Sequence, residues 1–130
     1  AQAASLCPMM QFSVAPWRIL NKEQLDIVRN AAELHMQMGH YILNCAKETA
    51  KSGEPIMRTM EYMYPNEGCE KLNDQFMLGD RILVAPVCEK GASRRQVYLP
   101  KGKWKLENEK VNDGVECPIE KLIWFEREEG

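Results

Sequence analysis

The residues of this chain with the best chemistry for proton transfer are its aspartates, because paired carboxylates commonly serve as general acid and base. The nearest pair is Asp74 and Asp80, six positions apart across an apolar stretch with a glycine break. Nothing in this spacing predicts that the two carboxyl groups converge. Asp74 is expected to cap the turn before a strand, and Asp80 to face solvent. The chain is therefore predicted to carry no catalytic residue of its own.

The cysteines and histidines lack the spacing of a metal site. No Cys-x-x-Cys pair occurs, and His35 and His40 are five positions apart, whereas a helix brings two imidazoles to one metal at a spacing of four. His35 is expected to be a hydrogen-bonded core residue on a helix, and no metal or cofactor is expected. An odd number of scattered cysteines favours free thiols in a reducing compartment over disulfides, which predicts a cytoplasmic location. The five cysteines are Cys7, Cys45, Cys69, Cys88 and Cys117.

The charge balance argues against nucleic acid as a partner. The 130 residues carry a formal net charge of -2, whereas a phosphate-binding surface usually needs an excess of basic residues. The densest basic cluster begins at Arg94 and Arg95 and is closely followed by glutamates, so a solvated strand face is the better interpretation. No apolar run approaches the roughly 20 residues that span a bilayer, so no membrane partner is expected.

The first half of the chain has helical periodicity. Residues 1–10 are predicted to be the last turns of a helix that ends at Pro8. Asn21 and Gln24 have the spacing of a capping box, and apolar residues then recur every three or four positions. This pattern predicts a helix over residues 22–51, with a bend at Gly39 and a stop at Gly53. Residues 55–60 are a short strand candidate.

The second half changes to the two-residue period of strands. A turn cluster at residues 64–68 separates the two halves near Asn66. Turn signals also occur at residues 90–91, 100–102 and 112–114, and their spacing indicates an antiparallel sheet or sandwich. The strand candidates are residues 75–78, 81–87, 95–99, 103–106, 115–117 and 122–126. The fold class is therefore α/β in the first half and all-β in the second.

Four motifs, in order, resemble the C-terminal part of glycoside hydrolase family 31. Residues 8–13 (Pro-Met-Met-Gln-Phe-Ser) with the Pro-Trp at 16–17 resemble the segment after the seventh strand of its barrel. Residues 53–58 (Gly-Glu-Pro-Ile-Met-Arg) resemble the eighth strand. The blocks at 75–79 (Gln-Phe-Met-Leu-Gly) and 83–87 (Leu-Val-Ala-Pro-Val), and then Val-Tyr-Leu-Pro-x-Gly-x-Trp at 97–104, resemble the start of the following β-domain.

This resemblance implies a domain organisation. Residues 1–66 would be the C-terminal portion of a catalytic (β/α)8 TIM barrel, and residues 67–130 part of the antiparallel β-sandwich domain that follows it. Family 31 enzymes are retaining α-glycosidases that act on α-linked carbohydrate and need no metal or organic cofactor. Their aspartate nucleophile and acid/base follow the fourth and sixth strands, so both are expected upstream of Ala1. The fragment is therefore expected to be inactive without the remainder of its parent chain.

The resemblance also places one loop at the active-site rim, because barrel enzymes build their sites from loops after the strands. Gln11 and Ser13 can donate and accept hydrogen bonds with sugar hydroxyls, and Trp17 offers a flat apolar face to a pyranose ring. These three are the predicted substrate-binding residues. Many members carry Arg-x-His where this chain has Gln11-Phe12-Ser13, and its form is closer to the branch named for the myogenesis-regulating glycosidase. That branch implies an α-galactoside or a related α-linked sugar.

Alternatives remain for these residues and for the whole chain. Gln11 and Ser13 could satisfy backbone groups of their own loop, and Trp17 could plug the barrel rim against the long helix. Arg58, inside an apolar strand, needs a carboxylate partner from the missing strands or from Glu61. The chain as a whole could be a stand-alone carbohydrate-binding or structural β-module. Such a module would leave residues 55–60 as an unpaired parallel strand and expose the apolar stripe of the helix.

Overall fold

The core of the structure is an antiparallel sheet of five short strands. The computed structural model describes residues 3–66, 68–86, 94–95, 97–100, 104–105, 115–116 and 123–127. Within them the sheet order is β1-β2-β3-β7-β5, and each neighbouring pair is antiparallel. A second sheet pairs β4 with β6. The strands are β1 (Met57–Thr59), β2 (Phe76–Leu78), β3 (Ile82–Ala85), β4 (Arg94–Arg95), β5 (Trp104–Lys105), β6 (Val115–Glu116) and β7 (Ile123–Arg127).

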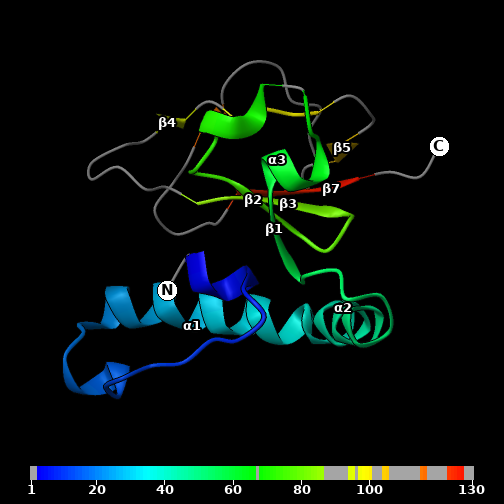
Figure 1. The fold of residues 1–130 in the computed structure, drawn as a ribbon. Coiled ribbons are helices and arrows are strands. Elements are labelled where there is room, and N and C mark those ends of the chain that lie inside the picture. Colours follow the sequence, from blue (N-terminus) through cyan, green and yellow to red (C-terminus); the bar gives the residue numbers. More distant parts are fainter. Residues whose placement is uncertain are drawn as a thin grey trace.

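Two consecutive helices cover one face of the sheet (Figure 1). Helix α1 (Lys22–Gln37) begins at the predicted capping box, in which Gln24 N–H donates to Asn21 Oδ1 at 2.8 Å. Helix α2 (Gly39–Ser52) ends at Gly53, whose φ of 77° is left-handed as a glycine C-cap requires. The prediction of one helix over residues 22–51 is wrong in its continuity, because the helix breaks at Met38, next to the predicted bend.

The opposite face of the sheet is covered by short elements that the sequence pattern did not reveal. Helix α3 (Met60–Met63) follows β1 directly, and Thr59 caps it by accepting a hydrogen bond from Tyr62 N–H at 3.1 Å. The 3-10 helix η3 (Cys69–Lys71) lies next along the chain.

Near the N-terminus, on the helical side of the sheet, a 3-10 helix η1 (Ala3–Leu6) replaces the predicted end of an α-helix and packs against α1.

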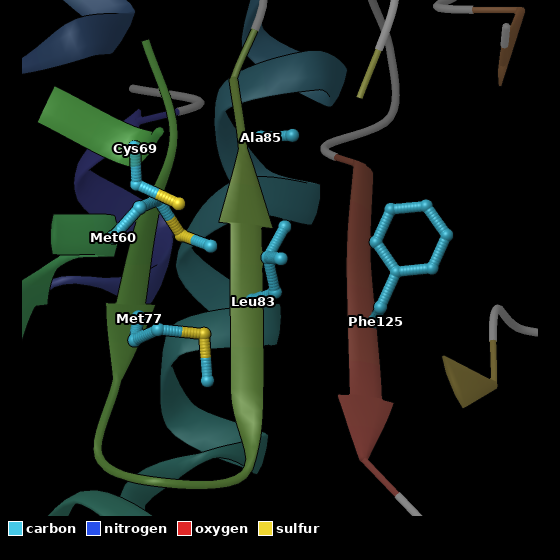
Figure 2. Close-up of a cluster of buried hydrophobic side chains, with 6 residues drawn as sticks. All are labelled: Met60, Cys69, Met77, Leu83, Ala85 and Phe125. Atoms are coloured by element: carbon cyan, nitrogen blue, oxygen red, sulfur yellow. The ribbon is translucent and has the colours of Figure 1, made fainter. Parts of the chain in front are cut away.

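Alternate residues of the strands enter two separate hydrophobic clusters. Figure 2 shows the cluster on the α3 face, where Met60 from α3 and Cys69 from η3 lie against the sheet. Its strand members are Met77, Leu83, Ala85 and Phe125. The other cluster, on the helical face, contains Leu6, Leu78, Ile82 and Val84, with Leu34, Met38, Tyr41 and Ile42 of the helices packed against it. All four residues of β3 are buried, so this strand lies in the middle of the body.

A stand-alone chain is expected to have an unpaired parallel strand and an exposed apolar helix stripe. The described residues do not show the first and show the second only in part. β1 is paired along one edge with β2, antiparallel, in register Arg58 to Met77, so the expectation of an unpaired parallel strand is wrong. The apolar stripe of the helices is largely covered, because Leu34, Met38 and Ile42 pack on the sheet. Neither α1 nor α2 has a fully buried residue, however, and Met36 and Leu43 remain exposed on the outer side.

Five of the six strands predicted in the second half are confirmed where the structure describes them, although most are shorter. The strand predicted over residues 95–99 is wrong, because only Arg95 belongs to β4 and residues 97–99 form no strand. The antiparallel sheet is also confirmed. The turn signals at residues 90–91, 101–102 and 112–114 lie outside the described residues, as do Val87, Cys88, Asp113 and Cys117. The two sheets are the five-stranded and two-stranded units given above, and the assignment of residues 1–66 to a barrel and 67–130 to a sandwich stays a prediction.

We expect Leu83→Ala to lower the free energy of unfolding by about 2–5 kcal/mol, because it removes a fully buried side chain from the central strand. Leu43→Ala is the matched control, since Leu43 is 51% exposed on α2. Urea unfolding followed by circular dichroism measures both. Equal losses for the two variants would contradict the placement of β3 in the core.

Candidate functional site

The loop predicted to bind substrate is exposed over most of its length. Gln11 and Ser13 are exposed, and no hydrogen bond involves their side chains among the described residues. The interpretation that they satisfy backbone groups of the loop is therefore not supported. Trp17 lies in the 3-10 helix η2 (Pro16–Arg18) and is 74% exposed, so the described residues do not bury it, and the alternative that it plugs a barrel rim stays a prediction. The side chains of all three predicted residues are therefore accessible to a ligand.

The carboxylates do not form a catalytic pair. Asp74 precedes β2 and Asp80 follows it in the turn to β3, so the two lie at opposite ends of the same short strand. Both are exposed, which confirms the solvent-facing position expected for Asp80. Asp26 is also exposed, on α1, where it forms a 3.7 Å ion pair with Arg29. Asp113 lies outside the described residues.

The turn between β2 and β3 is held against α2 by Tyr41. Its hydroxyl donates to Leu78 O at 2.7 Å and accepts from Arg81 N–H at 3.3 Å. Between these two residues, Gly79 has a φ of 66°, and its N–H donates to Ile56 O at 2.7 Å. A Cβ at Gly79 would collide with the Tyr41 hydroxyl and come within 2.7 Å of Cys45 Sγ. Only glycine therefore fits this contact.

Burial keeps the two titratable groups at this turn protonated. It raises the pKa of Tyr41, and the neighbouring Cys45 adds to the rise. Burial likewise raises the pKa of the Cys45 thiol, although the hydrogen bond with Tyr41 opposes the change. A neutral thiol is a poor nucleophile. Tyr41 and Cys45, which lie four residues apart on one face of α2, are therefore structural groups rather than catalytic ones.

Two further residues of the sequence motifs tie the later segments to the sheet. The amide of Gln75, which is 4% exposed, donates from Nε2 to Tyr98 O at 2.9 Å and accepts at Oε1 from Tyr98 N–H at 3.1 Å. This double hydrogen bond imitates one rung of a β-ladder. The indole of Trp104 donates to Pro100 O at 2.8 Å and so links β5 to the segment of residues 97–100. The spacing of the motifs did not predict either contact.

Within the described residues Arg58 on β1 does not pair with Glu61, one of its two predicted partners, and a carboxylate from the missing barrel strands stays a prediction. The Nε of Arg58 donates to Pro55 O at 2.7 Å, and its guanidinium contacts Met63 Sδ at 3.3 Å. Glu61 is not its partner, because the ion pairs of the described residues do not include Arg58. Nearby, Glu54 accepts a hydrogen bond from the Tyr62 hydroxyl, which raises the pKa of Tyr62. In the part of the chain that the structure describes, the half-buried guanidinium is thus held by a carbonyl oxygen and a thioether.

His35 occupies the structural position expected for it, with Nδ1 at 3.1 Å from Ser5 O. Among the residues that the structure describes, no group of three or more acidic, cysteine or histidine side chains could hold a metal ion. The described helices are all too short or too polar to cross a membrane. Cys45 is a free cysteine, whereas Cys88 and Cys117 lie outside the described range.

Comparison with known families identifies the chain. Residues 53–129 match the model of the glycosyl hydrolase family 31 C-terminal domain. The chain belongs to glycoside hydrolase family 31. The matched region includes β1 and every later strand. Gln75, Gly79 and Trp104, whose contacts are described above, therefore lie in the part of the chain that matches the family 31 domain.

Relatives of this family 31 chain include glycosidases. It is 38% identical over 106 residues to the myogenesis-regulating glycosidase of Mus musculus, covering 80% of the chain and 15% of that protein. It is 32% identical over 111 residues to the SITS-binding protein of Tetronarce californica, covering 82% of the chain and 16% of that protein. The chain thus spans about a sixth of the length of these relatives.

Solved family 31 structures share the fold of this chain. The dextranase of Flavobacterium johnsoniae complexed with glucose matches with a TM-score of 0.81 and 35% identity, over 88% of this chain and 15% of that one. A cycloalternan-forming enzyme from Listeria monocytogenes, in complex with a pentasaccharide substrate, matches with a TM-score of 0.87 and 27% identity, over 97% and 14% respectively. The arrangement of helices on the sheet therefore recurs within larger enzymes.

We expect Gly79→Ala to destabilise this family 31 chain by more than Gly53→Ala. Both glycines have a left-handed backbone, which costs an alanine about 1–2 kcal/mol. Only Gly79 adds a collision with Tyr41 and Cys45, because the space around Gly53 is open. Thermal unfolding of the two variants measures the difference. A Gly79→Ala variant that melts no lower than Gly53→Ala would contradict the packing of Tyr41 against the turn.

Proposed function

We propose that this chain is the C-terminal part of a retaining α-glycoside hydrolase that hydrolyses O-glycosidic bonds in α-linked carbohydrate. The family match carries the proposal. Further support comes from relatives named as α-glucosidases, such as the neutral alpha-glucosidase AB of Mus musculus, which is 35% identical over 86 residues. That alignment covers 65% of this chain and 9% of that protein.

The reaction needs two carboxyl groups about 5–5.5 Å apart. One attacks the anomeric carbon and forms a glycosyl-enzyme ester, while the other gives its proton to the leaving oxygen. The second group then takes a proton from water, which breaks the ester and releases the sugar with retained configuration. The separation of Asp74 from Asp80 by a whole strand supports the proposal that both catalytic aspartates belong to the part of the enzyme that precedes Ala1. This chain alone is then inactive.

In the proposed enzyme, residues 1–66 complete the (β/α)8 barrel and β1 is its eighth strand. Among the described residues one edge of β1 has no paired strand, which leaves room for a further strand of the parent chain. The exposed apolar side chains Met9, Ile19 and Met36 also support contact with a further part of the same polypeptide. Residues 67–130 form part of the β-domain behind the barrel.

The substrate loop and the location of the protein complete the proposal. Gln11, Ser13 and Trp17 contact the sugar, supported by the exposure of all three side chains. An α-galactoside or a related sugar is the proposed substrate class, supported by the likeness to the myogenesis-regulating glycosidase. A reducing, cytoplasmic location is proposed as well, supported by the free thiol of Cys45.

A stand-alone β-rich module is the second candidate, and one observation favours it. The helices pack on the sheet through Leu34, Met38 and Ile42, so the chain has a core of its own. Such a module would bind carbohydrate or another protein without cleaving a bond. The exposed Trp17 and Ile19 weigh against it, because an isolated domain gains nothing from these large apolar surfaces.

We expect the full-length polypeptide that carries this sequence to release nitrophenol from at least one nitrophenyl α-glycoside, and the 130-residue chain to release none. The reason is that both catalytic carboxylates are supplied by the preceding part. A panel of α-glucoside, α-galactoside and α-xyloside substrates measures this by absorbance. Turnover by the short chain alone would refute the proposed position of the aspartates, and a full-length protein inactive on the whole panel would favour the binding module.

Within the full-length enzyme, we expect Ser13→Ala to lower kcat/KM by about tenfold, the value of one lost hydrogen bond to substrate. Ser52→Ala is the control, because the Ser52 hydroxyl donates to Glu48 O at the far end of α2. Steady-state kinetics on the best nitrophenyl glycoside measures both. An unchanged kcat/KM for Ser13→Ala would remove this serine from the substrate site.

A further inference from the structure

A pocket of about 450 Å³ lies beside α3, at the start of β2 and away from the loop of Gln11, Ser13 and Trp17. Its walls are supplied by the end of β1, by α3, by η3, by the segment that leads into β2 and by Pro86 after β3. Its volume is within the range of roughly 300–1,000 Å³ that is typical of small-molecule sites. Nothing in the proposed hydrolysis uses it.

The pocket has an apolar lining. Leu72, which packs against the cluster on the α3 face, is half-buried and Pro86 is buried, so a ligand can be held against a surface that is already fixed in the body. Gln75 also lines the pocket, but its amide is engaged in the double hydrogen bond with Tyr98. It therefore sets the shape of the wall and does not contact a ligand through its polar atoms.

The polar groups around this lining are mainly hydrogen-bond acceptors. Three carboxylates contribute, from Glu61, Glu70 and Asp74, and no lysine or arginine is among the lining residues. The Oε2 atom of Glu61 is buried and has no hydrogen-bond partner in the described part of the chain. A buried acceptor without a donor costs free energy that a donating ligand would recover. The charge of the pocket excludes phosphate and carboxylate ligands.

Two kinds of donor could satisfy these acceptors: a compact cation or a neutral polyol. A cation prefers acceptors that converge on one point, but the acidic side chains of the described residues do not gather into a group that could hold a metal ion. Acceptors that are spread around an apolar floor suit a sugar ring instead, because its hydroxyls lie around the rim and its C–H faces are apolar. The apolar side chains of Leu72 and Pro86 and the separated carboxylates match this arrangement.

We propose that this pocket is a saccharide-binding site, distinct from the hydrolytic site, in which Glu61 accepts a hydrogen bond from a sugar hydroxyl. The choice of an α-linked sugar as the ligand rests on the proposed function, whereas the inference of a saccharide site rests on the lining of the pocket. A second binding point of this kind would hold one part of a long carbohydrate on the β-domain while another part is cleaved.

Hydrogen–deuterium exchange of the full-length polypeptide, titrated with isomaltotriose, tests the proposal, because it locates protection by peptide. We expect saturable protection in the peptides that span residues 59–76, separate from any protection in residues 11–17. Glu61→Gln removes the charged acceptor with little change of shape. The sugar concentration that gives half-maximal protection should be about tenfold higher for this variant than for wild type. Glu33→Gln makes the same change of charge on the exposed side of α1 and should leave the midpoint unchanged.

The outcomes separate this inference from the proposed function. Absence of protection at residues 59–76 in an enzyme that hydrolyses α-glycosides overturns the site and leaves the hydrolase proposal intact. Equal midpoints for wild type and Glu61→Gln, or protection by n-butylamine in place of the sugar, also overturn it. Protection without any hydrolysis supports the site and counts against the hydrolase. If Glu61→Gln melts below wild type, Glu70→Gln at the exposed rim provides the same test.

Discussion

Burial of β3 on both of its faces is the constraint on which the rest of this structure depends. Ile82 and Val84 point into the cluster under the helices, and Leu83 and Ala85 into the cluster under α3. A strand that is apolar on both sides is stable only if each face receives its own cover, since each exposed Å² of apolar surface costs about 25 cal/mol. The helices and the α3–η3 segment are therefore both required, one for each face.

The contact between Tyr41 and the turn at Gly79 sets how the helical cover meets the sheet. The hydroxyl of Tyr41 bridges Leu78 O and Arg81 N–H, the backbone groups on either side of the turn. These two hydrogen bonds fix α2 to one place along the strands. The Gly79 N–H, which donates to Ile56 O, joins the segment before β1 to the same point. One turn thus links the helices, β1 and the central hairpin.

The family 31 motifs in this part of the molecule are structural in origin. Gln75 replaces a missing rung of a ladder by its bond pair with Tyr98, and Trp104 binds Pro100 O. Neither side chain has chemistry to offer a substrate in these positions. Exposed polar side chains of the described residues lie at the edges of the body, among them Ser13 in its loop and Glu70 at the rim of the acidic pocket beside α3. The core and the candidate ligand sites are therefore separate parts of the structure.

The secondary structure of the first half could be predicted well because its signals are local. The capping box at Asn21 and the glycine stop at Gly53 depend on residues within one turn, and both are confirmed. The break at Met38 was placed only approximately, because helix periodicity continues through it. Helix α3 was missed, because its four residues are too few for a periodic pattern and its cap, Thr59, was assigned to the strand before it.

The partners of individual side chains could not be predicted from the sequence, and Arg58 illustrates why. Its position in an apolar strand indicated a carboxylate partner, but a carbonyl oxygen and a thioether lie closer once β1 turns into α3. The bond between Gln75 and Tyr98 likewise joins residues 23 positions apart. The sequence by itself determined the family, the alternation of buried residues and the helix ends, because these follow from neighbours along the chain. Only the tertiary structure decided that β1 joins the later sheet, that Tyr41 holds the turn and that an acidic pocket forms beside α3, because each depends on which distant segments come into contact.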